Sequence, residues 1–109
     1  MQKPELPPRV DDFRKTHPEI WKAFTELAEQ CHEAGPLTEK ERRLVKVALC
    51  IGAALEGGTH SAVRNARSAG VAQEDLTHIA VLAISTLGFP AAMRAMSWVH
   101  EEGRGRHSG

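Results

Sequence analysis

A carboxylate and an imidazole stand one helical turn apart in residues 55–70, LEGGTHSAVRNARSAG. Glu56 and His60 are spaced i, i+4, so on a helix their side chains share one face and can form a hydrogen bond. A carboxylate that orients an imidazole is a common arrangement for general acid/base catalysis. Arg67 lies on the same side and Arg64 adjoins it, where guanidinium groups would hold the carboxylate of a small substrate. The sequence therefore predicts this acid/base pair as catalytic and the two arginines as substrate-binding.

A second interpretation of the same residues stays open. Charged side chains at helical spacing are also typical of a helix side that faces solvent or a neighbouring subunit. A pocket lined by Glu56 and His60 would favour catalysis, whereas an open or packed face would favour a structural role.

The two cysteines do not form a recognisable reactive pair. Cys31 and Cys50 are far apart in the sequence, and each lies within a helical apolar pattern. This spacing fits neither a disulfide framework nor a Cys-x-x-Cys motif, so both are predicted to be small buried hydrophobic residues. No two histidines have the i, i+4 spacing of a helical zinc site, so we expect no metal and no cofactor.

Helical periodicity runs through the chain from Asp11 onward, and no alternating segment indicates a strand. Residues 1–10 contain several prolines and show no period, so they are predicted to be a flexible N-terminal arm. Residues 11–102 are predicted to form one helical domain, and residues 103–109 a disordered tail.

Turn and cap residues divide this domain into helices. Thr16 is predicted to cap a first long helix with Pro18 in its first turn, and Gly35-Pro36 to end it. Thr38 and Glu41 form a capping box that opens a second helix. Gly70 is predicted to end a third helix over about 58–69, and Gly88-Phe89-Pro90 to break a fourth over about 73–87 before a fifth over about 90–99. The fold class is therefore all-α with five to six helices.

The second predicted helix, which continues through RRLVKVALCIGAAL, is apolar on nearly every side between Val47 and Leu55. A helix with so little polar surface is buried on most sides. One domain of 109 residues offers few such positions. Burial between subunits is the economical explanation, so we expect a homo-oligomer.

Charge and hydropathy exclude several classes of partner. The chain has 14 Lys and Arg against 14 Asp and Glu, spread along its length, so neither nucleic acid nor an anionic membrane is an expected partner. The N-terminal segment MQKPELPPRV lacks the apolar core of a signal peptide. The apolar stretches are shorter than the ~20 residues of a membrane span, so we expect a soluble cytoplasmic protein.

Three segments, in this order, give the chain a resemblance to a known family: LTEKERRLVKVAL, HSAVRNARSAGVAQEDL and LGFPAAMRAMSWV. Over roughly residues 17–102 the chain resembles the carboxymuconolactone decarboxylase and alkyl hydroperoxidase D-like family. The resemblance implies an all-helical subunit that assembles into trimers or hexamers. It also implies one of two chemistries. The peroxidase branch uses a Cys-x-x-Cys pair, a following histidine and an upstream glutamate, whereas the decarboxylase branch has the histidine, no cysteine pair and a small carboxylated lactone as substrate.

The family's catalytic positions carry other residues here when the resemblance is anchored on Gly70 without gaps. The two cysteine positions then fall on Leu55 and Gly58, the histidine on Ala62 and the glutamate on Arg43. None of these side chains forms a thiolate or acts as a general base at neutral pH. The dithiol peroxidase mechanism is therefore excluded at these positions.

Two functional hypotheses follow. The first is a cofactor-free decarboxylase or related lyase that acts on a small carboxylated molecule through Glu56 and His60. A gap of two residues in the alignment before Gly70 would return His60 to the family's histidine position. The second is a non-catalytic oligomeric module for binding or interaction, with a degenerate site. A thiol peroxidase that uses Cys50 or Cys31 is a third, which the missing cysteine pair disfavours.

Overall fold

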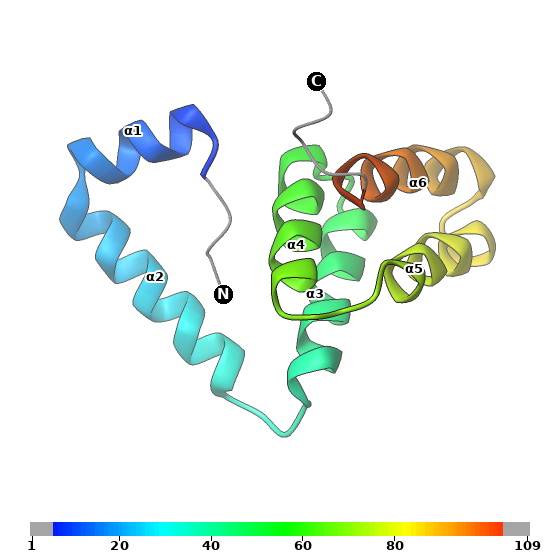
Figure 1. Cartoon of the computed structure of the whole chain (residues 1–109), viewed down its shortest axis with the longest axis horizontal. Coiled ribbons are helices and arrows are strands. Elements are labelled where there is room, and N and C mark those ends of the chain that lie inside the picture. Colours follow the sequence, from blue (N-terminus) through cyan, green and yellow to red (C-terminus); the bar gives the residue numbers. More distant parts are fainter. Residues whose placement is uncertain (1–5, 104–109) are drawn as a thin grey trace. The chain divides into compact units, whose positions relative to one another are not determined.

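The computed structural model describes residues 6–103, and this part of the chain contains helices and no strand (Figure 1). The predicted all-α fold is therefore confirmed. α1 and α2 form one compact unit, and α3 to α6 form another. Residues 1–5 of the expected arm and 104–109 of the expected tail lie outside the described residues. The helices are α1 (Pro8–Thr16), α2 (Pro18–Glu33), α3 (Glu39–Gly52), α4 (Glu56–Ser68), α5 (Gln73–Thr86) and α6 (Phe89–Gly103).

Pro18 separates α1 from α2. A proline ring disfavours helical backbone angles at the preceding residue, and His17 has φ −134° and ψ 65°. The prediction that Thr16 caps the longer helix is wrong, because Thr16 is the last residue of α1 and His17 is the N-cap of α2. The Thr16 hydroxyl instead donates to the carbonyl of Asp12 at 3.0 Å.

α1 begins at Pro8, inside the segment expected to be an arm, and it has no apolar period that the sequence could reveal. None of its residues is buried. Asp11 accepts a hydrogen bond from Arg14 at 2.7 Å and pairs with Lys15 at 3.2 Å, and these contacts hold the pKa of the Asp11 carboxyl below its usual range. Ion pairs one turn apart support a helix without requiring an apolar face.

α2 is amphipathic, and its apolar side is exposed. Ile20, Phe24 and Leu27 are 57%, 57% and 62% exposed, and no residue of α2 is buried. The residues on this side form one stripe, in which Trp21 is half-buried and the others are exposed. Cys31 lies on this stripe and is exposed, so the prediction that it is buried is wrong; Cys50 is half-buried.

The N-terminus of α3 carries the predicted capping box, which is confirmed. The Glu41 N–H donates to the Thr38 hydroxyl at 3.1 Å, and the Thr38 N–H donates to the Glu41 carboxylate at 2.8 Å. Two N–H groups that would otherwise lack partners in the helix are thereby satisfied.

The C-terminus of α3 ends in a Schellman motif with an unusual residue. The Leu55 N–H donates to the Cys50 carbonyl and the Ala54 N–H to the Ile51 carbonyl, each at 3.0 Å. Ala54 has φ +57°, in the left-handed region where glycine is the normal occupant. The turn into α4 is therefore strained.

The C-termini of α4 and α5 use glycine as the sequence predicts. Gly70 has φ +93° and Gly88 has φ +106°. After α4, the Val71 N–H donates to the Ala66 carbonyl at 3.0 Å, which again closes a Schellman motif. These turns reverse the chain and pack α4, α5 and α6 against one another.

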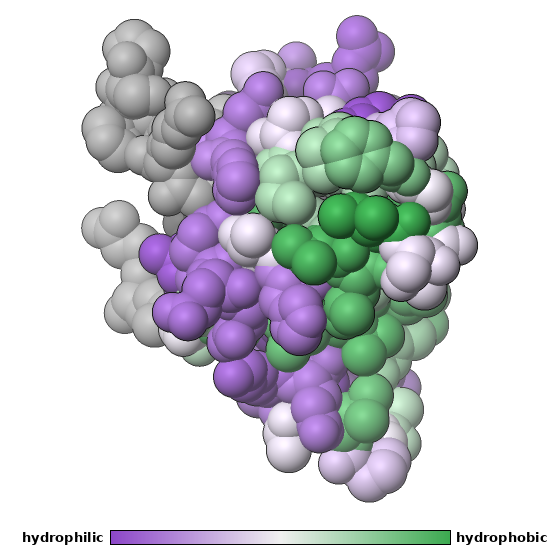
Figure 2. Space-filling view, turned by 90° about the vertical axis from the view of Figure 1, so that its right-hand side faces the viewer, coloured by the Kyte–Doolittle hydropathy of each residue, from purple (hydrophilic) through white to green (hydrophobic). Residues whose placement is uncertain are grey.

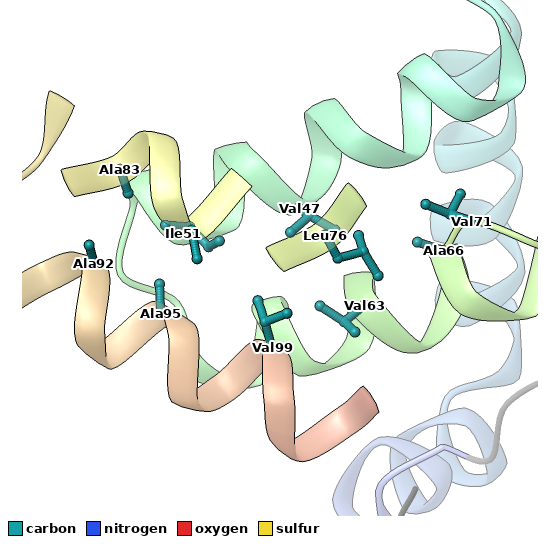
Figure 3. Packing of buried hydrophobic residues seen from close by; sticks show 11 residues of the cluster. Val47, Ile51, Val63, Ala66, Val71, Leu76, Ala83, Ala92, Ala95 and Val99 are labelled. Carbon is teal, nitrogen blue, oxygen red and sulfur yellow. The ribbon is translucent and has the colours of Figure 1, made fainter. Parts of the chain in front are cut away.

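Small aliphatic side chains form the core of the α3–α6 unit (Figure 3). Five of the fully or almost fully buried positions are alanine, which lets neighbouring helices approach closely. The larger members, such as Leu76 and Val63, fill the centre. The buried alanines are Ala66, Ala80, Ala83, Ala92 and Ala95.

The α3–α6 unit also exposes large apolar side chains. Figure 2 shows a continuous hydrophobic area, bordered by hydrophilic residues, on the side where α5 and α6 meet. Leu87 and Phe89 are exposed at that end, and Leu49 of α3 is 66% exposed. Burial of α3 between subunits stays a prediction. Within residues 6–103, no helix is long and apolar enough to cross a membrane.

Replacing Ala54 with glycine should stabilise the protein, because it removes a β-carbon from a left-handed backbone position. The net gain should be roughly 0.5–1 kcal/mol after the greater entropy of unfolded glycine is subtracted. Thermal unfolding followed by circular dichroism measures this gain as a rise in Tm. The matched control is Ala53→Gly, at φ −87°, which should lower Tm. An unchanged or lower Tm for A54G would show that the turn is not strained.

Candidate functional site

The structure brings His60 close to two carboxylates rather than one. Its Nε2 atom lies 4.0 Å from the Glu56 carboxylate and 3.4 Å from that of Glu101, in the last turns of α6. The imidazole is 16% exposed and packs beside the ring of Trp98, with 6.5 Å between centroids. Sequence reasoning missed Glu101, because only the packing of α4 on α6 brings these distant residues together.

This cluster lies at the edge of the protein. The Glu56 and Glu101 side chains are about two-thirds exposed, so solvent screens their attraction to the imidazole. Two hollows, one between α3 and α4 and the other between α3 and α5, are lined by neither Glu56 nor His60. The arrangement can orient an imidazole, and it lies outside both of these hollows.

The two predicted substrate-binding arginines have different surroundings. Arg67 donates from Nη1 to the Val71 carbonyl at 2.8 Å, so its guanidinium holds the turn that follows α4. A cation at this place also suits the negative end of the helix dipole. Arg64 is half-buried on α4. The structure thus gives Arg67 a structural contact within the chain.

A separate pocket of about 320 Å³ lies between α3 and α4; we call it the α3–α4 pocket. Arg43 and Lys46 line it from α3, and Ser61 and Asn65 line it from α4. The lining contains two basic residues and no acidic one. Both polar side chains from α4 can donate hydrogen bonds. This pocket is suited to an anion.

Arg43 is held in place by a neighbour on its own helix. Its Nε donates to the Glu39 carboxylate at 2.7 Å, one turn earlier. A guanidinium has five N–H donors in a fixed plane, so this bond uses one of them and fixes the orientation of the rest. Lys46 follows on the same helix and also lines the pocket.

The rest of the pocket lining is apolar and consists of Leu49, Cys50, Gly58 and Ala62. The packing is tight around Gly58. A Cβ added at Gly58 would lie 3.2 Å from the Cys50 sulfur and 3.2 Å from the Leu55 Cβ, closer than most real contacts. Burial raises the pKa of the Cys50 thiol above its ordinary value, so this sulfur is a poor nucleophile at neutral pH.

The positions that the family resemblance assigns to catalysis converge on this pocket. Arg43, Gly58 and Ala62 all line it, and the side chain of Leu55 lies where a Cβ added at Gly58 would meet it. On the ungapped reading, the fold therefore keeps the location of the family's site while its chemical groups differ. Sequence reasoning missed Lys46, Ser61 and Asn65, because their spacing within each helix resembles that of any solvated helix side.

Comparison with protein families agrees with this fold. The model of the carboxymuconolactone decarboxylase family matches residues 18–101, from the start of α2 to the last turns of α6. No curated protein matches the chain. No solved structure matches it. The match covers most of the chain and includes the helices that build the α3–α4 pocket, so the chain belongs to the carboxymuconolactone decarboxylase family.

Proposed function

We propose that this protein binds a small carboxylate-bearing molecule in the α3–α4 pocket and does not convert it. One observation carries the proposal: the pocket at the family's catalytic positions is lined by Arg43 and Lys46 and holds no group that can act as a base at neutral pH. The protein would thus be a binding member of a family that includes decarboxylases.

The ligand's carboxylate would lie between the two helices. The Arg43 guanidinium supplies paired N–H donors, and Lys46 adds a second positive charge. Ser61 and Asn65 can donate from the opposite wall, and the hydrocarbon part of the ligand would contact Leu49. A volume of about 320 Å³ is at the small end of ligand pockets, which favours a molecule the size of a common metabolite.

Catalysis at this pocket is disfavoured by the protonation of its groups. Arginine and lysine carry their protons at neutral pH, and burial keeps the Cys50 thiol protonated. Ala62 stands where the family has its histidine on the ungapped reading. Such a pocket can hold a carboxylate, but none of these side chains can remove a proton from another atom of the bound molecule.

Arg43→Gln should weaken carboxylate binding about tenfold or more, because it removes a charge-assisted contact worth roughly 1.5–3 kcal/mol. Isothermal titration with benzoate and succinate, and with benzamide as the uncharged control, measures the effect. Arg42→Gln is the matched control, since Arg42 also pairs with Glu39 but does not line the pocket. Binding that is equal in R43Q and R42Q, or absent from the native protein, would refute the proposal.

A second candidate function is acid/base catalysis by Glu56 and His60 on a small carboxylated molecule. The observation that favours it is the imidazole Nε2 lying within 4.0 Å of Glu56 and 3.4 Å of Glu101. These carboxylates would orient the ring toward a substrate. Arg64, on the next turn of α4, would supply the cation that binds the substrate's carboxylate.

The variant His60→Ala separates catalysis from structure. If the imidazole is catalytic, H60A should lose turnover of a carboxylated lactone by a factor of 10² or more, with Tm nearly unchanged. NMR of lactone and product follows the reaction, and the exposed His78→Ala is the control. A lower Tm without any change in turnover would instead assign His60 to packing beside Trp98.

Neither cysteine should be required for function. Iodoacetamide should modify the exposed Cys31 faster than Cys50 at neutral pH. Because burial raises the Cys50 pKa, its modification should accelerate only at a pH above the usual range of a thiol. Mass spectrometry gives both rates, and the double variant Cys31→Ser/Cys50→Ser should keep carboxylate binding. Loss of peroxide turnover in that variant, with its fold intact, would revive a thiol peroxidase.

A further inference from the structure

The α3–α4 pocket has two unlike ends. Its two helices run antiparallel and side by side, joined by residues 53–55 (Figure 1). Cys50 and Gly58 lie opposite each other near this turn, because a Cβ added at Gly58 would be 3.2 Å from the Cys50 sulfur. Arg43 is about two helical turns away from Cys50 on α3. On α4, Asn65 is equally far from Gly58, so both polar side chains lie at the end remote from the turn.

We call these the basic end, with Arg43 and Asn65, and the turn end, with Leu49, Cys50 and Gly58. They are about 10 Å apart, at ~1.5 Å per helical residue. The second cation, Lys46, lies between them, one helical turn before Cys50. None of the described lining residues at the turn end is charged. A ligand that matches this pocket therefore carries its negative charge at one extremity only.

The dipoles of the two helices do not change this pattern. In antiparallel neighbours, the positive end of one dipole lies beside the negative end of the other, so the two largely cancel at each end of the pocket. The first turn of α4, near the turn end, also contains the carboxylate of Glu56, so the positive end of this helix already has an anion beside it. Side chains therefore decide which end of the pocket receives a negative charge.

We infer that the α3–α4 pocket selects a monocarboxylate and holds it in one direction, with the carboxylate at the basic end and the hydrocarbon tail at the turn end. The inference rests on the proposed function and adds the class of ligand to it. A dicarboxylate would place its second charge beside Leu49 and Cys50, where it loses hydration without gaining a cation. An uncharged tail removes apolar surface from water at the same place.

The lack of a side chain at Gly58 sets how far the tail can extend. A Cβ at this position would lie 3.2 Å from both the Cys50 sulfur and the Leu55 Cβ. A methyl group would therefore occupy space at the turn end, and close packing leaves little room for its neighbours to move aside. Gly58 is thus a specificity-determining residue for the length of the ligand.

Hexanoate and adipate test the class of ligand, because they have the same chain length and differ by one carboxylate. Hexanoate should bind at least tenfold more tightly than adipate. It should also bind at least tenfold more tightly than propionate, since each buried methylene raises the affinity about fourfold. NMR titration of the full chain gives the three dissociation constants.

Equal affinities for hexanoate and adipate, or for hexanoate and propionate, would overturn the inference and leave carboxylate binding in place. If none of the three acids bound, the proposed function would fail together with the inference. The two failures are therefore distinguishable in one experiment.

Gly58→Ala tests the direction of the tail. It should weaken hexanoate binding about fivefold or more and change propionate binding less than twofold, because the shorter tail does not reach the turn end. The matched control is Gly57→Ala, in the same helical turn, where an added Cβ has nothing within 4 Å and does not line the pocket. G57A should bind both acids as the native protein does.

Cys50→Ala makes the opposite change at the same end, and it keeps the test decisive if circular dichroism shows that G58A does not fold. Removal of the sulfur widens the turn end, so octanoate should gain affinity relative to hexanoate by about fourfold. An unchanged ratio in C50A, or equal weakening of propionate and hexanoate in G58A, would show that the tail does not point toward the turn.

Discussion

Close packing of α3 to α6 on alanine side chains constrains the rest of that unit. Five alanines occupy its interior, so the helix backbones approach one another and leave little room at their crossings. The turns between the helices must then be tight. Gly70 and Gly88 meet this demand with positive φ angles, and Ala54 meets it with a strained one. The same small side chains leave larger apolar residues on the surface, since the interior has no space for them.

The separation of α3 and α4 also fixes what chemistry their pocket can perform. The Cys50 sulfur fills the space beside Gly58, so a reactive side chain at position 58 would need its neighbours to move. The polar groups that line the pocket come instead from exposed helix positions, Arg43 and Lys46 opposite Ser61 and Asn65. On the ungapped alignment, the family's catalytic positions therefore line a pocket that has positive charge but no base.

Local signals in the sequence were enough to predict most of the fold. The capping box at Thr38 and the breaks at Gly70 and Gly88 have short-range causes, and the structure bears them out. α1 was missed because its support is ionic, and the Thr16 cap was assigned wrongly because Pro18 acts on His17. The site was harder to predict. The 3.4 Å approach of Glu101 to His60 depends on how α4 and α6 cross, and no local pattern in the sequence encodes that crossing.

The absence of any buried residue in α1 and α2 gives the chain two kinds of stability. The α3–α6 unit has an interior, so its free energy of unfolding belongs to the single molecule. A helix of 16 residues without burial is marginal in water, and its amide protons should exchange with solvent through local opening. A separate molecule that covered the apolar side of α2 would add a term that grows with the logarithm of its concentration. The stability of this helix therefore depends on what covers it, and not only on its own sequence.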